Sequence, residues 1–412
     1  MSGNKVLVVN SGSSSLKFQL FNVAKGISAV ARGVIDQIGD TSTSTLRVTA
    51  GQDGVSLAGA DEQTTKEPVT DHKQALNLAT DFLRQLEWAR NLQQDLVGCG
   101  HRVVHGRDFP CAALVDDAIR KLIKEGAAMA PLHNPANLLG IDAASKVYPG
   151  TPQVAVFDTA FHQTMTPGTY TYALPQDICS KHGIRKYGAH GTSYRYLVQE
   201  SSRMLEKPAN KLNLILCHIG AGASLCAVEN GKSVDTTMGL TPLEGLVMAS
   251  RCGDVDPAAV LYLLQHVCGG DVQEADKLLN KQSGLIGLTG HQDLKRVLDD
   301  AAAGNLQAVT AAEVYVGRIQ KYVGAYMMKL KGKVDAIVVA GGAGEASFDL
   351  RQRLFSDMQR FGLKLDEVKN KSMKRGEAAC VSTEDSSIAL WVIPTDEELS
   401  IARQTLEVIH EE

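Results

Sequence analysis

Apolar residues and polar turns alternate along the chain in a way that predicts an α/β protein. At the amino end, VLVVN (6–10) and LKFQLF (16–21) flank a serine-rich turn, a pattern that predicts a β-hairpin. Residues 40–70 are polar and rich in Gly and Thr, which predicts short edge strands and loops. Between 71 and 90, apolar residues recur at helical spacing and predict an amphipathic helix.

The same kind of pattern continues through the rest of the chain. LVGCGHRVVHG (96–106) and QVAVFDTAFHQT (153–164) each predict a strand that ends in a polar segment. Residues 213–230 repeat the strand–turn–strand opening, and VDAIVVAGGAGEAS (334–347) predicts a strand, a Gly-rich turn and a helix. Asn134 before Pro135, and Thr395 three residues before Glu398, are typical of helix N-caps.

Length and this repeated opening together indicate two lobes. The chain has 412 residues, more than one compact core usually holds. We therefore expect a duplicated α/β architecture with a cleft between the lobes. The expected boundaries are 1–159, completed by 394–412, for the first lobe and 160–393 for the second.

Composition narrows the class of protein. The chain is 44% hydrophobic and 21% charged with a formal net charge of −4, so no overall basic field is available to attract nucleic acid or membrane. The eight cysteines include no CxxC pair, and no apolar stretch approaches the roughly 18 residues of a membrane span. We expect a cytoplasmic protein with reduced thiols and small-molecule partners.

The serine-rich turn carries more polar groups than a turn needs. Backbone N–H groups and hydroxyls of Ser13 and Ser15 can form an anion-binding concavity, and Lys17 adds a positive charge. Asn10 offers a neutral oxygen suited to hydrated Mg²⁺. The turn lacks the GK[ST] of a Walker A loop. A serine-rich hairpin turn without a ligand is the alternative.

Several other groups stand at strand ends and helix starts. Arg102 follows a strand and suits carboxylate or phosphate, although a structural ion pair is also possible; its neighbours His101 and His105 lack the acidic partner of a metal site. Asp158 ends another apolar strand, where capping is the alternative role. His133, His190 and Arg251 precede helix starts, where anions bind, although a single histidine there is more often structural.

Two Gly-rich loops, HIGAGAS (218–224) and GGAGE (341–345), can approach a nucleotide closely. With the cations, the histidines and Asp158, they make up the set of groups that phosphoryl transfer uses, because this chemistry depends on positioning and charge neutralisation. Two readings from other classes remain. One is a non-catalytic actin-like nucleotide-binding protein, and the other is a metal-dependent hydrolase using the His-rich loops.

Read together, these motifs resemble one known family. VNSGSSSLKF, GHRVVHG, APLHNPANLLGI, VAVFDTAFHQT, GAHGTSYRY, TTMGLTPLEGLVMASRCGDVDPA, KQSGLIG, AGGAGE and PTDEEL resemble, in order, the signatures of the acetate kinases. Propionate kinases share the pattern, and butyrate kinases a looser form. The resemblance implies a two-lobed fold of the actin/hexokinase/Hsp70 (ribonuclease H-like) superfamily and a homodimer, with nucleotide binding and dimerisation in the second lobe. It also implies reversible phosphoryl transfer from ATP to a short carboxylate, dependent on Mg²⁺ or, alternatively, Mn²⁺.

The resemblance also implies residue roles. Asn10 and Glu397 would serve the metal, and Ser13, Ser15 and Lys17 the phosphoryl group. Arg102, Asp158, His190 and Arg251 would carry the chemistry, assisted by His133. The acyl pocket would be walled by Val104, Leu132, Ala189 and Pro242. The nucleotide would be held by His218, Gly220, Ala221, Gly222, Asp293, Leu294, Lys295, Gly342, Ala343, Gly344, Glu345 and Ala346.

Five positions depart from the family pattern. Ala189 stands where Phe is usual, which would enlarge the acyl pocket and favour wider acceptance, for example of propionate. Ala221 and Ala346 replace Asn, and Lys295 replaces Arg in a shortened loop. Tyr194 stands where His is common. The changes on the nucleotide side predict weak or relaxed nucleotide recognition, with pyrophosphate or another NTP as an alternative donor.

Overall fold

The chain folds into two compact units. The computed structural model describes residues 3–39, 44–51, 56–57, 60–131 and 133–411. Unit 1 comprises Met1–Phe161 with Asp396–Glu412, and unit 2 comprises His162–Thr395. Each unit has its own sheet and its own buried core.

Unit 1 is built on an eight-stranded sheet with the order β5-β4-β3-β2-β1-β6-β8-β7. Strand β2 is antiparallel to its neighbours β1 and β3, whereas β6 and β8 run parallel to β1. The predicted hairpin is present as β1 and β2, with Asn10 directly opposite Lys17. The strands are β1 (Lys5–Ser11), β2 (Ser15–Asn22), β3 (Ser28–Asp36), β4 (Thr45–Ala50), β5 (Glu62–Lys66), β6 (Leu96–Val103), β7 (Ala113–Leu114) and β8 (Gln153–Phe157).

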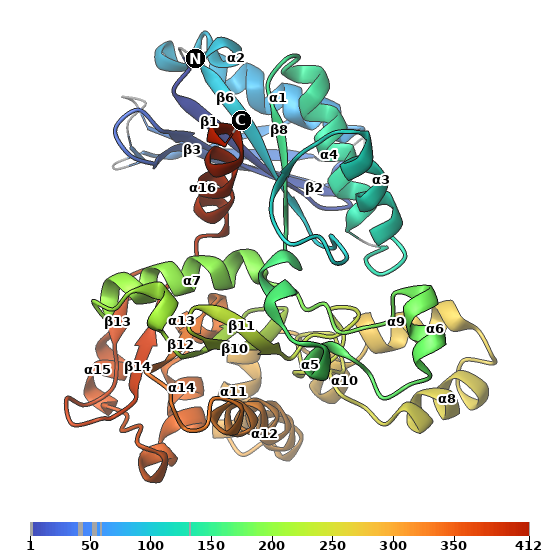
Figure 1. The fold of residues 1–412 in the computed structure, drawn as a ribbon, viewed down its shortest axis with the longest axis vertical. Helices are drawn as coiled ribbons and strands as arrows, with labels where there is room; N and C mark the ends of the chain where they lie inside the picture. Colours follow the sequence, from blue (N-terminus) through green and yellow to red (C-terminus); the bar gives the residue numbers. More distant parts are fainter. Residues whose placement is uncertain (1–2, 40–43, 52–55, 58–59, 132, 412) are drawn as a thin grey trace. The chain divides into compact units, whose positions relative to one another are not determined.

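Helices cover both faces of this sheet (Figure 1). Helices α1 and α4 share a core with β1 and β2, while α16 packs its apolar residues against the opposite face. Gly100 of β6 makes this packing possible, because a Cβ there would lie 2.2 Å from Thr405 Oγ1 of α16. The helices are α1 (His72–Arg84), α2 (Leu92–Asp95), α3 (Asp117–Gly126), α4 (Asn134–Val147) and α16 (Glu397–His410), with 3-10 turns η1 (Glu87–Ala89) and η2 (Ala160–Thr164).

The sheet of unit 2 repeats the central topology of unit 1. Its order is β11-β10-β9-β12-β14-β13, with β9, β10 and β11 antiparallel and with β12 and β14 parallel to β9. The strands are β9 (Leu214–Ile219), β10 (Ala223–Glu229), β11 (Lys232–Thr236), β12 (Ala336–Ala340), β13 (Ala379–Cys380) and β14 (Ala389–Val392). Three antiparallel strands followed by two parallel ones in both units confirm the expected duplicated α/β fold.

The second sheet is also covered on both faces. Helix α12 packs Tyr315, Ile319 and Val323 into the core beneath the sheet, and Figure 1 shows α7 on its other side. The helices are α5 (Pro167–Tyr170), α6 (Gln176–His182), α7 (Gly191–Met204), α8 (Pro257–His266), α9 (Val272–Lys281), α10 (Gly284–Thr289), α11 (Leu294–Ala302), α12 (Leu306–Lys329), α13 (Gly342–Ala346), α14 (Phe348–Phe355) and α15 (Glu367–Ser372), with 3-10 turns η3 (Ala209–Lys211) and η4 (Met358–Phe361).

Two predicted helix caps were wrong. His133, not Asn134, occupies the N-cap of α4, because the buried Asn134 side chain bonds instead to the backbone of His105. Asp396, not Thr395, caps α16 by accepting from Leu399 N at 2.8 Å. In both cases the side chain next to the cap has a better partner in the tertiary structure.

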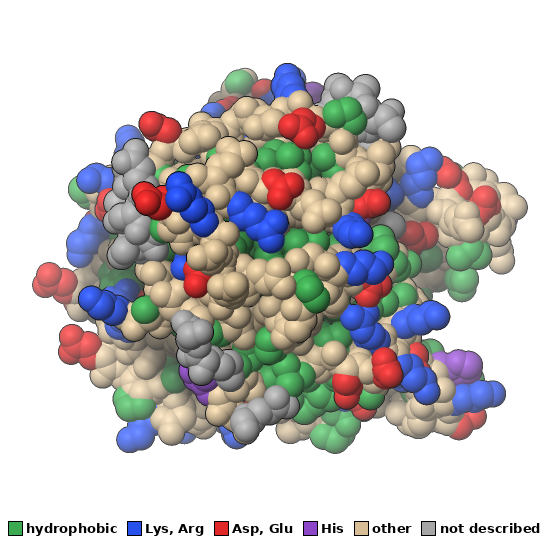
Figure 2. Space-filling view, turned by 90° about the horizontal axis from the view of Figure 1, so that it is seen from above, with side chains coloured by type: hydrophobic (Ala, Val, Ile, Leu, Met, Phe, Trp, Pro, Cys, Tyr) green, Lys and Arg blue, Asp and Glu red, His purple; other side chains and the backbone are tan. Residues whose placement is uncertain are grey.

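The surface carries charges of both signs. On the face that Figure 2 shows, Lys and Arg side chains lie interspersed with Asp and Glu. None of the helices in the described part of the chain combines the length and the apolar character that crossing a bilayer would require.

Candidate active site

The polar hairpin turn of unit 1 is held from behind. Gly12 N donates to Ser15 O at 2.8 Å and closes the turn. His72 of α1 bonds to Gly12 O at 2.7 Å, and Asn137 of α4 donates to Ser11 O at 2.9 Å. Ser13 and Lys17 remain exposed and Ser15 half-buried. The turn is therefore rigidly mounted while its predicted anion-binding side chains stay accessible at the surface of the unit.

Arg102 and Asp158 meet at the ends of two parallel strands. Parallel β6 and β8 end side by side, so Arg102 and the residue that follows β8 are neighbours. Arg102 Nε and Nη2 donate to Asp158 Oδ2 at 3.0 and 2.7 Å, and Arg102 Nη1 lies 3.8 Å from Glu397 Oε2. Burial alone would lower the pKa of Arg102, but the two carboxylates outweigh it and raise the pKa above its usual range.

Glu397 and Asn10 offer oxygens that suit a magnesium ion. Glu397 begins α16 beside Glu398, and burial together with the charge of Glu397 raises the pKa of Glu398. Among the described residues, no group of three or more His, Cys, Asp or Glu is arranged to hold a metal. Mg²⁺ commonly takes only one or two protein carboxylates, with water and substrate phosphate as its other ligands. The oxygen donors and the local excess of negative charge fit such an ion.

Two asparagines that the sequence analysis did not assign to the site organise the neighbouring loop, and one of them, Asn134, was predicted only as a helix cap. Asn137 Oδ1 accepts from Val104 N at 3.2 Å, and Asn134 Oδ1 accepts from His105 N at 3.1 Å. These bonds tie the loop after β6 to the start of α4, where His133 stands. Val104 is buried, and Leu132 lies outside the described residues. Single asparagines in a helical pattern give no sequence signal for such a role.

His190 of unit 2 is held in one orientation. It occupies the N-cap of α7 with a φ of 58° and makes no capping bond with its side chain. Its Nδ1 lies 2.8 Å from Ser224 Oγ, which also bonds to the Tyr194 hydroxyl. The ring stacks on His218 with centroids 4.3 Å apart. The bond through Nδ1 and the stacking on His218 fix the orientation of the ring.

Arg251 and His190 converge on the loop between β9 and β10. A Cβ built on Gly222 would lie 3.6 Å from Arg251 Nη1 and 3.7 Å from His190 Nε2. Arg251 donates to Pro242 O at 3.1 Å. Burial lowers the pKa of Arg251, and no carboxylate in the described part of the chain forms an ion pair with it. Arg251 thus directs a charge that has no carboxylate partner among the described residues to the place that the His190 ring also faces, an arrangement suited to an anion.

Ala189 lies inside the core of unit 2. It is 4% exposed, and its carbonyl bonds to His162 Nε2 at 2.9 Å. The ring of His162 lies edge-on to Tyr194 and bonds through Nδ1 to Ser233 Oγ. The backbone just before His190 is therefore anchored to β11.

A cavity of about 770 Å³ in unit 2 brings together three predicted nucleotide loops. Its lining includes predicted residues from the β9–β10 loop, the start of α11 and helix α13, namely Gly220, Ala221, Asp293, Leu294, Lys295, Gly342, Ala343 and Ala346. His218, Gly222, Gly344 and Glu345 are not part of the lining. Glu345 instead accepts from Gly341 N at 3.0 Å and holds the turn after β12.

The cavity also contains residues that sequence reasoning missed. Arg375, Phe348, Asp349 and Tyr315 line it, from segments far apart along the chain. Lys295 Nζ is paired with Asp299 at 2.7 Å, so the lysine is partly neutralised before any ligand binds. Arg375 follows α15 in an exposed polar stretch that carries no motif, and only the fold brings it to the cavity.

Comparison with known proteins agrees with this geometry. The model of the acetokinase family matches residues 5–403. An acetate kinase from Methanosarcina thermophila is 45% identical over 99% of this chain and 98% of its own length, and one from Halothermothrix orenii is 44% identical over 98% and 99%.

Solved structures lead to the same family. The crystal structure of Porphyromonas gingivalis acetate kinase is 37% identical with a TM-score of 0.90, covering 99% of this chain and 100% of that one. A propionate kinase from Francisella tularensis is also 37% identical with a TM-score of 0.89, covering 98% and 100%. The match extends through both units and nearly end to end in each relative. The chain therefore belongs to the acetokinase family and is a phosphotransferase with a carboxyl group as acceptor.

Proposed function

We propose that this protein transfers the terminal phosphoryl group of ATP reversibly to acetate, giving acetyl phosphate and ADP. An acetate oxygen attacks the γ-phosphorus, the new O–P bond forms, and the bond to the β–γ bridging oxygen breaks with its electrons retained on ADP. No covalent enzyme intermediate is needed. The observation that carries this proposal is the convergence of Arg251 Nη1 and His190 Nε2 on one place beside Gly222, with no carboxylate of the described residues paired to the arginine.

The residue roles follow from charge. The transferring group spreads negative charge over its equatorial oxygens, so Arg251, His190 and Arg102 stabilise it by donating hydrogen bonds. Asp158 orients Arg102 through the two bonds to its Oδ2. Lys17, Ser13 and Ser15 donate to phosphate oxygens, and His133 assists. Val104, Leu132 and Pro242 wall the acyl group.

Asn10 and Glu397 would hold Mg²⁺, for which Mn²⁺ could substitute. The ion would neutralise phosphate charge, which is its general part in phosphoryl transfer. The cavity of unit 2 supports nucleotide binding between α11 and α13. Ala221 and Ala346 stand there without side-chain hydrogen-bonding groups, which supports relaxed nucleotide recognition and keeps pyrophosphate or another NTP as an alternative donor.

Propionate is the second candidate acceptor. Ala189 supports it, as does the similarity to a propionate kinase, which is as high in identity as that to the acetate kinase structure. One methylene discriminates by only about 1–3 kcal/mol, so a shifted preference is expected rather than exclusive use of one acid.

A homodimer completes the proposal. Helix α8 contributes no buried residue to unit 2, although its sequence PAAVLYLLQH is largely apolar. Leu261, Tyr262 and Val267 are each 59–62% exposed. A helix that is apolar on its exposed side supports association with a second copy.

The test is detection of acyl phosphate as the hydroxamate. Purified protein is supplied with Mg²⁺, a donor (ATP, GTP or pyrophosphate) and an acceptor (acetate, propionate or butyrate), with Arg251→Ala as the inactive control. We expect product with ATP and acetate, and kcat/KM for propionate within tenfold of that for acetate. If product forms with pyrophosphate and not with ATP or GTP, pyrophosphate replaces ATP as the proposed donor. No product with any pair would favour a catalytically silent nucleotide-binding protein.

A further inference from the structure

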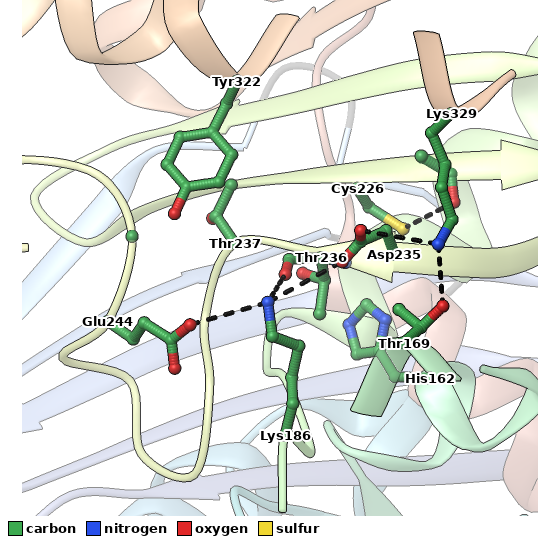
Figure 3. A network of polar contacts seen from close by, with 12 residues as sticks. His162, Thr169, Lys186, Cys226, Asp235, Thr236, Thr237, Glu244, Tyr322 and Lys329 are labelled. Atoms are coloured by element: carbon green, nitrogen blue, oxygen red, sulfur yellow. Dashed lines mark hydrogen bonds and ion pairs between the residues drawn. The ribbon is translucent and has the colours of Figure 1, made fainter. Parts of the chain in front are cut away.

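A polar cluster in unit 2 lies between the segments that carry His190 and Arg251 but includes neither residue. Figure 3 shows its centre, where Lys186 points between Asp235 and Glu244. Lys186 Nζ donates to Thr236 O at 2.9 Å and lies 3.6 Å from Glu244 Oε1 and 3.7 Å from Asp235 Oδ1. The lysine side chain is only 14% exposed. Because the ammonium group is largely withdrawn from water, these partners supply the interactions that stabilise it.

Lys186 belongs to the segment that leads to His190. Residues 183–190 join α6 to α7 and end at the His190 N-cap. Lys186 N donates to Tyr170 O at 2.8 Å, and the next two backbone amides, of Tyr187 and Gly188, both donate to Gly239 O, at 3.0 and 3.1 Å. The segment that leads to His190 is therefore hydrogen-bonded to the segment that leads towards Arg251.

Glu244 belongs to the Arg251 loop, residues 237–254, which also carries Pro242. Its Oε1 faces Lys186, while its Oε2 accepts from the Tyr172 hydroxyl. Tyr172 OH in turn accepts from Leu240 N at 2.9 Å. Burial, then the charge of Glu244, raises the pKa of Tyr172, which keeps the phenol protonated as a donor. Glu244 thus ties the first half of this loop to both neighbouring segments.

The other end of the loop is held separately. Asp254 accepts from Gly245 N at 2.9 Å and from the Tyr322 hydroxyl at 2.8 Å, and Arg318 Nη1 donates to Gly245 O at 2.8 Å. With its far end fixed on α12, the first half of the loop is attached to the neighbouring segments through Gly239 O and through Glu244, which contacts Lys186 and Tyr172.

We propose that Lys186 and Glu244 are positioning residues that set His190 and Arg251 in their reactive arrangement without contacting substrate. The inference rests on the proposed roles of His190 and Arg251. Loss of Lys186 removes the cation that faces Glu244, and loss of Glu244 leaves Lys186 bonded to Asp235 and Thr236 but no longer to the Arg251 loop, so the loop shifts. A displacement of about 1 Å in a positioned group can cost on the order of 10²-fold in rate.

Lys329 provides the matched control. It also pairs with Asp235, at 3.9 Å, and it donates to Thr169 Oγ1 at 2.7 Å (Figure 3). It belongs to α12 and makes no bond to the Arg251 loop in the described structure. Lys329→Met removes a charge from the same aspartate but leaves the loop attachment intact.

The experiment compares Lys186→Met, Lys186→Arg, Glu244→Gln and Lys329→Met in steady-state kinetics, with ADP affinity by calorimetry and thermal melting. We expect Lys186→Met and Glu244→Gln to lower kcat about 10- to 100-fold, with ADP affinity within twofold of wild type. Lys186→Arg should recover part of the lost kcat, and Lys329→Met should match wild type. Unchanged kcat in both test variants, or an equal loss in Lys329→Met, would overturn the inference.

A double-variant cycle separates this inference from the proposed function. If Glu244 acts through Arg251, Glu244→Gln costs less activity in an Arg251→Lys background that keeps a measurable rate than it does in wild type. If Arg251→Ala is inactive while Lys186→Met and Glu244→Gln keep the wild-type kcat, only the role of the positioning pair is refuted. Arg251→Ala at wild-type kcat refutes the proposed role of Arg251 and the positioning pair together.

Discussion

Arg102 donates two hydrogen bonds to a single carboxylate oxygen of Asp158, from Nε at 3.0 Å and from Nη2 at 2.7 Å. The Asp158 side chain is 1% exposed and that of Arg102 is 22% exposed, so the carboxylate is buried while the guanidinium is partly accessible. This geometry fixes the plane of the guanidinium and directs its remaining donors towards Glu397.

Asp158→Asn should lower kcat/KM by about 10²- to 10³-fold, because the guanidinium loses its orienting charge. The hydroxamate assay measures the loss, and circular dichroism checks the fold. Asp36→Asn is the control, since Asp36 pairs with Arg47 in the same unit but is 40% exposed. The control should change stability by no more than about 1 kcal/mol and leave the rate unchanged. An Asp158→Asn enzyme as active as the control would contradict the assignment.

Ala189→Phe tests the acceptor preference. A bulkier side chain next to His190 should reduce kcat/KM for propionate about tenfold more than for acetate, within the discrimination that one methylene allows. Kinetics with both acids measure the ratio. Since Ala189 is buried, the melting temperature must be recorded, and Ala189→Gly serves as a variant that adds no volume. A ratio identical to wild type in a folded variant would remove Ala189 from the acyl pocket.

Ala346→Asn and Ala221→Asn should each strengthen nucleotide binding, because both positions line the cavity and an amide adds hydrogen-bonding groups there. One new hydrogen bond contributes about 0.5–1.5 kcal/mol, so KM for ATP should fall a few-fold while KM for acetate stays constant. Glu345, next to Ala346 in sequence, is not substituted, because its side chain accepts from Gly341 N and holds the turn after β12. Higher KM for ATP in both variants would show that the cavity does not take the nucleotide in this way.

His101 should make the protein less stable in mild acid. Burial lowers the pKa of this histidine to about 4, offset in part by its 2.7 Å bond to Gln153. The unfolded chain protonates it near pH 6.5, so the unfolded state binds more protons between these values. Stability contributed by the neutral ring is complete above about pH 6.5 and is lost as pH falls towards 4, on the order of 3 kcal/mol.

Denaturant unfolding of wild type and His101→Gln between pH 7 and 4.5 measures this slope. The variant lacks the titrating ring, so its curve should be flatter over that range. Parallel curves would assign the acid sensitivity to other groups.

Helix α8 should carry the dimer contact. Leu261→Asp with Tyr262→Asp places two charges on its exposed apolar side and should give a monomer in light scattering, whereas wild type should be a dimer. Exposed Met328→Asp on α12 is the control and should remain dimeric. A monomeric wild type would end the homodimer proposal, and a dimeric double variant would place the contact elsewhere.

Local sequence predicted the elements that present the candidate site. The turn at Ser13 and Ser15 and the strand that ends before Asp158 lie where the pattern indicated, whereas most of the predicted Gly-rich turn at 341–345 is helix α13, which begins at Gly342. Each depends on periodicity and turn chemistry within a few residues, which a single sequence displays directly.

The errors and omissions share a cause. Asn134 has the composition of an N-cap, but its amide is used by the backbone of His105, which is distant in sequence. The Thr395 hydroxyl bonds to Ser193 Oγ, which is distant in sequence, and Asp396 caps α16 in its place. Arg375 reaches the nucleotide cavity only because α15 packs near α14. Such choices are made by competition among long-range partners, which no local pattern contains.

The sequence by itself therefore determined the α/β class, the family and the residue types available for phosphoryl transfer, because these are written in local pattern and motif. Only the tertiary structure decided which of these side chains are paired. It gave Arg102 two carboxylates and left Arg251 with neutral acceptors among the described residues. The reason is electrostatic: a charge in a half-buried site is defined by the partners that folding brings to it.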